Sequence, residues 1–257
     1  MTDSIADQTA IQQAHLSFES LKPYGAALYL LGERAIVIEI ETEVSAISVT
    51  DDPKKPQSTL VQLQQQLNSQ RQIDGILDIV LGMHNLTVVF EPLITPIQTL
   101  LQFLEEHYIS ISTAGSTKSF KTGNLIELKV IYGGELGPDL PFVAKHHQCT
   151  QETVIQRHSA ESYLAYFMGF QPGFAYLHGL PSTLTTPRKT QPRTRIPAGS
   201  VAIAGNLTGV YPADSPGGWQ IIGRLCTEQP ALFDASRIPP AIISAGDQIK
   251  FVAVECQ

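Results

Sequence analysis

The sequence predicts an α+β N-terminal domain followed by a mainly-β barrel domain. Three observations predict this organisation. Apolar strand segments alternate with helices of regularly spaced leucines up to about residue 109, a small polar segment follows, and short strands separated by Gly and Pro turns fill the remainder. Many short strands with sharp turns and few helices are typical of a closed or nearly closed β-barrel rather than a parallel sheet.

The first domain is expected to span residues 21–109, after a polar extension over residues 1–20. "AALYLLGERAIVIEI" (26–40) and "GILDIVLGMHNLTVVFEP" (75–92) each contain two apolar, β-branched strands around a turn. A helix is predicted after each pair, one from Thr59 and one from Pro96. The apolar stripes of these helices are formed by Leu60, Leu63 and Leu67, and by Ile97, Leu100, Leu101 and Leu104. The predicted element order is therefore β-β-α-β-β-α.

The second domain is expected to begin after an interdomain linker, "SISTAGSTKSFKTGN", at residues 110–124. Residues 125–257 then form the barrel, with helical spacing over residues 150–167 in two short pieces. The strands predicted in this domain are "LIELKVIY", "SVAIAG", "GVYPA", "GWQIIGRL" and "DQIKFVAV". His158, between the two helical pieces, is expected to have a capping or packing role rather than a catalytic one.

The composition excludes several classes of protein. With 257 residues, 43% apolar content and a net charge of -7, the chain predicts a globular protein without a nucleic-acid or anionic-membrane surface. The N-terminus lacks the basic start and apolar core of a signal peptide, and no apolar run approaches the roughly 20 residues that span a bilayer. Cys149, Cys226 and Cys256 form no CxxC pair, which favours reduced thiols in a cytoplasmic protein.

The usual catalytic motifs are missing from the sequence. It has no G-x-x-x-x-G-K-[ST] phosphate loop, no G-x-S-x-G nucleophile elbow and no H-E-x-x-H zinc motif. Adjacent His146 and His147 point in different directions on any regular element, so we interpret them as a solvated pair and predict no metal site. No catalytic residue is assigned from the sequence.

One segment, residues 169–218, combines rigidity with unbalanced charge. No Asp or Glu occurs between Glu161 and Asp214, yet this stretch contains four cations, Arg188, Lys189, Arg193 and Arg195. Its prolines and glycines fix an irregular backbone, which is useful where side chains must be preorganised. Two interpretations stay open at this point: a proline-rich cap of the barrel with solvated arginines, or a pocket for a carboxylate, a phosphate or an acidic group of a partner.

Four segments of the sequence resemble the family of the 5-oxoprolinase B subunit. They are "YGGELGPDL" (132–140), "GFQPGFAYL" (169–177), "PRTRIPAGSVAIAG" (192–205) and "TGVYPADSPGGWQIIGR" (208–224), and the likeness extends over about residues 20–255. The family is also known as allophanate hydrolase subunit 1 and as the KipI-type inhibitor of a sporulation histidine kinase. The resemblance implies that the second domain is a cyclophilin-like β-barrel.

The resemblance also implies an activity. The chain would be the B subunit of an ATP-dependent 5-oxoprolinase, which acts with the A and C subunits to convert the substrate 5-oxoproline to glutamate, and it would be inactive alone. ATP with magnesium would be used at the level of the complex, at a site that cannot be located in this chain. Phosphorylating the lactam oxygen would require cations around phosphate and carboxylate oxygens.

The candidate substrate-binding or anion-binding residues lie in the segment 169–218. They are Arg188, Arg193, Arg195, His178 and Gln171. His178 stands where the family pattern leads us to expect glycine, and two roles stay open for it: a polar group beside the arginines, or a surface side chain without a role in the site. The residues expected to form the scaffold of the loop are Pro172, Gly173, Phe174, Pro216, Gly217, Gly218 and Trp219. "SPGGW" permits either a tight turn that packs Trp219 in the core or a backbone nest facing an anion.

Other functions remain as alternatives. The chain could be an interaction module that binds and inhibits a sensor histidine kinase, or a component related to carboxyltransferases and allophanate hydrolases. Prolyl isomerase activity is disfavoured, because "QPGF" lacks the arginine that precedes the cyclophilin proline by three residues, and Gly169 stands there.

Overall fold

The structure, a computed structural model, describes residues 17–40, 55–70, 73–113 and 123–255. The chain divides into two compact units, residues 1–120 and 121–257. Most of the predicted N-terminal extension lies outside the described residues. Helix α3 continues to Thr113, four residues into the segment predicted as the linker, and most of the rest of that segment is also outside the described residues.

The first unit is built on a five-stranded antiparallel sheet of order β1-β2-β3-β5-β4. Its strands are β1 (Ser17–Phe18), β2 (Ala26–Leu30), β3 (Ala35–Ile40), β4 (Ile76–Leu81) and β5 (Asn85–Phe90). The helical segments are the 3-10 helix η1 (Glu19–Tyr24) and the helices α2 (Lys55–Gln70) and α3 (Ile97–Thr113). From β2 onward the order of strands and α-helices is the predicted β-β-α-β-β-α.

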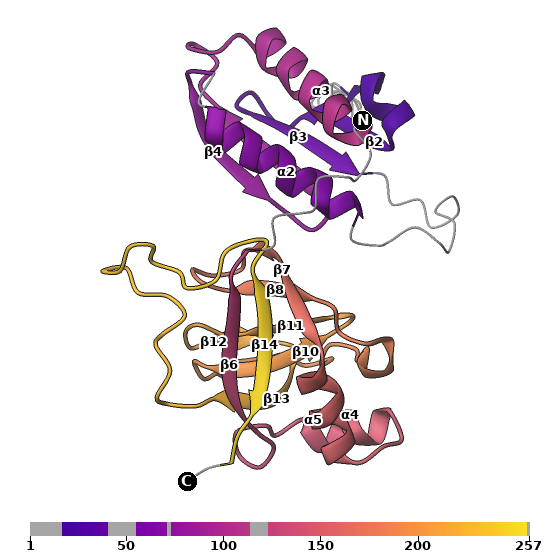
Figure 1. Cartoon of the computed structure of the whole chain (residues 1–257), viewed down its shortest axis with the longest axis vertical. Helices are drawn as coiled ribbons and strands as arrows, with labels where there is room; N and C mark the ends of the chain where they lie inside the picture. The colour runs from indigo at the N-terminus through magenta and orange to yellow at the C-terminus, as the bar shows by residue number, and fades with distance from the viewer. Residues whose placement is uncertain (1–16, 41–54, 71–72, 114–122, 256–257) are drawn as a thin grey trace, which may run out of the picture. The chain divides into compact units, whose positions relative to one another are not determined.

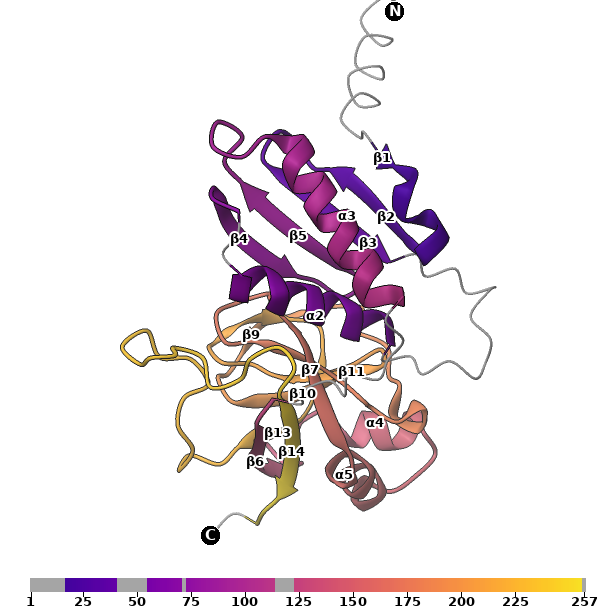
Figure 2. The same cartoon turned by 45° about the horizontal axis from the view of Figure 1, so that its top comes forward.

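Helices α2 and α3 cover one face of this sheet (Figures 1 and 2). The predicted leucine stripes are buried beneath them: Leu60, Leu63 and Leu67 of α2, and Leu100, Leu101 and Leu104 of α3. Leu86, Val88 and Phe90, at alternate positions of β5, are also fully buried. The two periodicities, about 3.6 residues for helices and two for strands, therefore meet in one apolar layer.

The second unit is a closed seven-stranded barrel of order β10-β11-β8-β7-β14-β6-β13, and pairing of β13 with β10 closes it (Figure 1). The strands are β6 (Leu125–Tyr132), β7 (Ser162–Met168), β8 (Ala175–His178), β10 (Ser200–Ala204), β11 (Leu207–Val210), β13 (Gln220–Leu225) and β14 (Gln248–Ala253). A separate ribbon pairs β9 (Arg193–Ile196) with β12 (Ser215–Gly217). A short 3-10 helix, η2, spans Ser182–Leu184. The barrel confirms the mainly-β prediction for this part of the chain.

Two helices, α4 (Leu140–His146) and α5 (Gln151–Ala160), pack side by side against this barrel (Figure 1). Their apolar residues Leu140, Val143 and Val154 join the inward-facing strand residues in one hydrophobic core. The strand residues alternate in the expected manner, since Val201 and Ile203 of β10 both belong to this core.

The expectation of two helical pieces over residues 150–167 is wrong for the second piece. Helix α5 begins at an N-cap, where Thr150 accepts a hydrogen bond from the backbone N–H of Thr153 at 3.2 Å, and it ends at Ala160. The chain then becomes strand β7, whose Tyr163 and Ala165 are buried at alternate positions. The apolar residues of "SYLAYFM" fit both periodicities, and pairing with β8 and β14 selects the strand.

His158, on α5, is fully buried and bonded through both ring nitrogens. The Thr208 hydroxyl donates to the carbonyl of Ala202 at 2.9 Å, so it accepts from Nε2 of His158, also at 2.9 Å. Nδ1 is then an acceptor, and the hydroxyl of Tyr132 donates to it at 2.8 Å. The predicted packing role of His158 is confirmed, as part of a satisfied polar chain inside the barrel.

Within the described residues, no helix is both long and apolar enough to cross a membrane. Cys149 and Cys226 are free thiols, whereas Cys256 lies outside the described residues.

Candidate functional site

The segment 169–218 contributes strands β8, β10 and β11 to the barrel, and it also forms the β9–β12 ribbon and the loops that connect these strands. It leaves β7 through a tight turn at Gly169–Gly173, in which Phe174 N–H donates to the carbonyl of Gln171 at 3.0 Å. Later it forms the β9–β12 ribbon and reaches Trp219 just before β13. Lys189 N–H donates to the carbonyl of Gly218 at 2.7 Å. This hydrogen bond joins the loop that carries Arg188, Lys189 and Arg193, called the cation loop below, to the start of β13.

An aromatic cluster lies on this side of the barrel. Phe174 is at its centre, and its ring centroid lies 4.9 Å from Tyr176, 5.4 Å from Tyr211 and 5.6 Å from Trp219. We use "aromatic cluster" for six residues, Phe167, Phe170, Phe174, Tyr176, Tyr211 and Trp219. A Cβ at Gly209 would lie 3.0 Å from Cζ of Phe174, so glycine on β11 lets this ring approach the strand closely. Trp219 is 6% exposed, which agrees with the alternative in which "SPGGW" packs this residue in the core.

Arg193 and Lys189 both meet Asp139. The guanidinium of Arg193 forms a two-pronged contact, with Nη1 2.7 Å from Oδ2 and Nη2 2.8 Å from Oδ1, and Nζ of Lys189 lies 3.2 Å from Oδ1. The backbone N–H of Ile221 donates to Oδ2 at 2.7 Å. Asp139 is 5% exposed, so this group braces the cation loop against α4 and β13.

These contacts set the ionisation of the carboxylate. Burial raises the pKa of Asp139, but hydrogen bonds from Arg193, the Ile221 N–H and Lys189 outweigh it and hold that pKa below its usual range. The hydrogen bond to Asp139 raises the pKa of Arg193 in turn. Asp139 therefore stays charged in the folded protein at neutral pH.

Arg195 is paired with the exposed Asp214. Its Nε donates to Oδ2 at 2.8 Å, and the Ala198 N–H donates to Oδ1 at 2.8 Å. The two side chains are 77% and 45% exposed, which is typical of a surface ion pair that fixes a turn. The structure thus places Arg195 on the ribbon surface, in a different ion pair from Arg193.

Arg188 differs from the other three cations. It is exposed, and no hydrogen bond or ion pair joins it to another residue in the described part of the chain. Burial raises the pKa of Tyr211 to about 12, while the backbone N–H of Trp219 and the charges of Arg188 and Arg193 oppose that rise. Gln220 fixes Pro187, the residue before Arg188, because Nε2 of Gln220 donates to the Pro187 carbonyl at 2.9 Å.

The cation loop retains positive charge after pairing. Arg188, Lys189 and Arg193 carry three positive charges, and Asp139 supplies one negative charge, which leaves a net charge of about +2 beside Tyr211. Such a site can receive a carboxylate or a phosphate, with the aromatic cluster as its apolar neighbour.

The other predicted residues have mixed positions. Gln171 donates from Nε2 to the carbonyl of Ala213 at 3.4 Å and so links two loops of the site. His178 lies at the end of β8 away from the 169–173 turn, where its ring stacks on Tyr166 with centroids 4.9 Å apart. Gly173 has φ +82° and a Cβ there would lie 2.7 Å from Cβ of Phe233, which restricts the position to glycine. Pro172 is exposed in the 169–173 turn, and Pro216 is exposed on strand β12.

Two further residues belong to this site although the sequence alone did not identify them. Asp139 and Tyr211 stand inside the motifs "YGGELGPDL" and "TGVYPADSPGGWQIIGR". The signal that could have identified Asp139 is its place as an acid just after Gly-Pro, in a motif whose other acid is Glu135.

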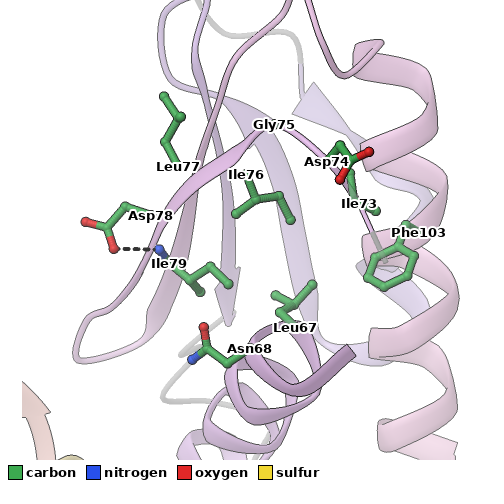
Figure 3. A pocket seen from close by; sticks show the side chains of 10 residues that line it. All are labelled: Leu67, Asn68, Ile73, Asp74, Gly75, Ile76, Leu77, Asp78, Ile79 and Phe103. Carbon is green, nitrogen blue, oxygen red and sulfur yellow. Dashed lines mark hydrogen bonds between the residues drawn. The ribbon is translucent and has the colours of Figure 1, made fainter. Parts of the chain in front are cut away.

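A pocket in the first unit offers a weaker candidate. Figure 3 shows it beside α2 and β4, with Phe103 of α3 on one side. Its lining surface is more polar than apolar, and the carboxylate of Asp78 already accepts from the Ile79 N–H at 2.8 Å. It includes none of the predicted site residues. Across the residues that the structure describes, no cluster of three His, Cys, Asp or Glu side chains could hold a metal ion.

Comparison with known proteins identifies relatives over most of the chain. A family model described as "Carboxyltransferase domain, subdomain C and D" matches residues 26–243. The 5-oxoprolinase B subunit of Haemophilus influenzae is 50% identical over 177 residues, which cover 69% of this chain and 79% of that protein. The 5-oxoprolinase B subunit of Escherichia coli O157:H7 is 39% identical over 229 residues, which cover 88% of this chain and 95% of that protein.

A solved structure agrees with the fold. The crystal structure of TTHA0988 is 29% identical, with a TM-score of 0.70 over 88% of this chain. This chain spans only 40% of the length of that solved chain. Sequence match, family model and fold agree over both units, and the chain therefore belongs to the 5-oxoprolinase B-subunit family.

Proposed function

We propose that this chain is the B subunit of an ATP-dependent 5-oxoprolinase, acting with the A and C subunits to hydrolyse 5-oxoproline to glutamate. The observation that carries the proposal is the identity of 50% and 39% to two proteins named as this component of 5-oxoprolinase. The kinase-inhibitor and carboxyltransferase alternatives have no observation that favours them over it. Because ATP is a cytoplasmic metabolite, the complex would work in the cytoplasm.

The cation loop supports this proposal. The reaction adds water across the C–N bond of a lactam, and phosphorylation of the lactam oxygen by ATP would make its carbon a better electrophile. The substrate carries a carboxylate and the activated lactam a phosphate, so both need cationic partners. Arg188 is the candidate contact for such an anion, whereas Arg193 serves through Asp139 as a brace.

ATP with magnesium is proposed for the complex rather than for a site in this chain. The net charge of about +2 in the cation loop suits phosphate oxygens. The residues of the loop could therefore help to hold a phosphoryl group, while the nucleotide and its magnesium ion would be bound with the help of the A and C subunits.

Reconstitution tests the proposal. The A, B and C subunits are purified separately, and glutamate release from 5-oxoproline is measured with ATP and magnesium for the full mixture and with each component omitted. We expect turnover only from the mixture that contains all three subunits. Turnover by this chain alone, or by a mixture that lacks it, would contradict its role as a required component.

Two arginine variants test the assignment of the anion contact. Arg188→Gln is expected to raise KM for 5-oxoproline or ATP roughly ten- to a hundredfold, since one charge-assisted contact is lost. Arg195→Gln makes the same arginine-to-glutamine change in an exposed ion pair with Asp214. It is expected to change KM by no more than about twofold. Equal effects of the two substitutions would reject Arg188 as the specific contact.

A further inference from the structure

Phe170 occupies an unfavourable backbone conformation. Its φ is 68°, and among the described residues other than glycine only Gln148 also has a positive φ. This left-handed region is costly for a bulky side chain, and glycine or asparagine would adopt it more readily. Hydrogen bonds on both sides maintain it: Gln171 N–H donates to the carbonyl of Gly169 at 2.8 Å, and Gly169 N–H donates to that of Phe174 at 3.2 Å. The turn therefore holds Phe170 in place against its own preference.

Burial does not offset this cost. Phe170 is 59% exposed although it belongs to the aromatic cluster. Its ring meets Phe174 and Tyr211 edge-on, with centroids 5.5 and 6.1 Å apart and interplanar angles of 76° and 89°. Much of the ring is therefore directed away from the protein. A strained backbone that presents an exposed ring is characteristic of residues that contact a ligand.

Phe170 and Arg188 both lie at the aromatic cluster. The ring of Phe170 meets the ring of Tyr211. The hydrogen bonds of Lys189 to Gly218 and of Gln220 to Pro187 hold the backbone of Arg188 next to Trp219. Together they offer an apolar surface and a cation without an acidic partner among the described residues. This combination suits a small ring that is apolar on one face and bears an anionic group, which describes a cyclic carboxylate such as 5-oxoproline.

We propose that Phe170 is a specificity-determining residue, whose ring packs against the methylene groups of the bound lactam while Arg188 receives its carboxylate. This inference rests on the proposed function. It adds a contact that selects for the ring of the substrate rather than for its charge. Because the contact is made to bound substrate before any bond changes, its loss should raise KM for 5-oxoproline more than it lowers kcat.

The test uses the reconstituted three-component complex with Phe170→Asn and Phe170→Leu. Asparagine tolerates the left-handed backbone and removes the apolar ring, whereas leucine keeps the backbone cost and much of the apolar surface. We expect Phe170→Asn to raise KM for 5-oxoproline roughly tenfold, with kcat and KM for ATP within about twofold and with Tm unchanged or higher. Phe170→Leu should have a smaller effect on KM.

Three results would overturn the proposal. An unchanged KM in Phe170→Asn would remove the substrate contact. A lower Tm would make Phe170 a structural cover of the aromatic cluster. Failure of the variant to co-elute with the A and C subunits in gel filtration would instead assign Phe170 to a protein interface.

A second measurement separates this inference from the proposed function. Trp219 is the single tryptophan of the chain, and its ring centroid lies 5.6 Å from Phe174, so its emission reports on the aromatic cluster. Titration of this chain with 5-oxoproline should change the emission of the wild type and not that of Phe170→Asn. No turnover by the wild-type complex together with this emission change would reject the proposed reaction but keep the contact; no emission change in the wild type would reject the contact.

Discussion

Asp139 accepts two hydrogen bonds from one guanidinium, that of Arg193, at 2.7 and 2.8 Å. The acid belongs to the loop before α4, and the arginine opens the β9–β12 ribbon. The pair joins two segments that are 54 positions apart in the sequence. Because Asp139 also accepts from Lys189 and from the backbone of Ile221, its four hydrogen bonds fix the cation loop relative to β13.

Replacing this acid should destabilise the second unit. Asp139→Asn would leave Arg193 and Lys189, both about 70% buried, without a compensating charge. We expect a loss of about 3–5 kcal/mol in the free energy of unfolding, the range for breaking a buried pair by removing one partner. Urea denaturation of the wild type and the variant measures it.

Asp214→Asn is the matched control. Asp214 pairs with Arg195 in the same segment, but both side chains are largely exposed, so solvent can replace the lost contact. The control should change unfolding little. If Asp139→Asn were as mild as Asp214→Asn, the bracing role of Asp139 would be wrong.

The sequence predicts the elements better than their contacts. The leucine stripes of α2 and α3 and the short strands of the barrel follow from local periodicity, which each segment carries in its own residues. Strand β7 is mistaken for a helix because "SYLAYFM" has apolar residues at both spacings, and its partners β8 and β14 decide the outcome. The local apolar pattern does not show which strands will pair in the folded protein, and here that pairing determines the secondary structure.

The candidate site shows the same limit. An excess of cations in residues 188–195 is evident from composition, but their partners lie 50 and 54 positions away for Asp139 and 19 for Asp214. Only the fold distinguishes Arg188 from Arg193 and Arg195. The positive φ of Phe170 is likewise imposed by the hydrogen bonds of its turn, and a phenylalanine gives no hint of it in the sequence.

The buried His158 predicts a pH dependence of stability. Burial lowers the pKa of His158 to about 3, whereas an unfolded histidine titrates near 6.5. Between these values the unfolded state binds the extra proton, so the contribution to stability is complete above about pH 6.5 and declines as the pH falls toward 3. We expect a loss of up to about 1.4 kcal/mol per pH unit in that window, measured by urea denaturation at about pH 7 and about pH 5.

His158→Gln provides the reference for this slope. Glutamine can still donate to Thr208 and accept from Tyr132, but it does not titrate. The variant should be less stable at neutral pH and should lose less stability on acidification than the wild type. Equal losses in the two proteins would exclude His158 as the source.

The Thr208 hydroxyl is predicted to matter more than its methyl group. Thr208→Val has nearly the same shape but leaves the buried His158 Nε2–H without an acceptor and removes one donor from the carbonyl of Ala202. Each unpaired buried group costs about 1–3 kcal/mol. Thr208→Ser keeps both hydrogen bonds and loses one methyl group, at about 1 kcal/mol. Thermal unfolding should rank the wild type above Ser and Ser above Val, and the reverse order of the two variants would contradict the hydrogen-bond argument.

Gly217, the last residue of β12, and the adjacent Gly218 should respond differently to the same substitution. A Cβ at Gly217 would overlap the hydroxyl of Tyr211 and lie 2.6 Å from Cδ1 of Ile196, whereas a Cβ at Gly218 would find its nearest atoms at 3.7 Å, in ordinary contact. Gly217→Ala should therefore displace Tyr211 from the aromatic cluster and cost about 1–3 kcal/mol. Gly218→Ala should cost less than 1 kcal/mol, about the size expected for a small surface change. Trp219 emission adds a local measurement, because the Tyr211 hydroxyl accepts from the backbone N–H of Trp219 and its displacement would alter the surroundings of the nearby indole. A spectral shift and a lower Tm in Gly217→Ala alone would support the close approach of Tyr211 to the turn, and identical behaviour of the two variants would contradict it.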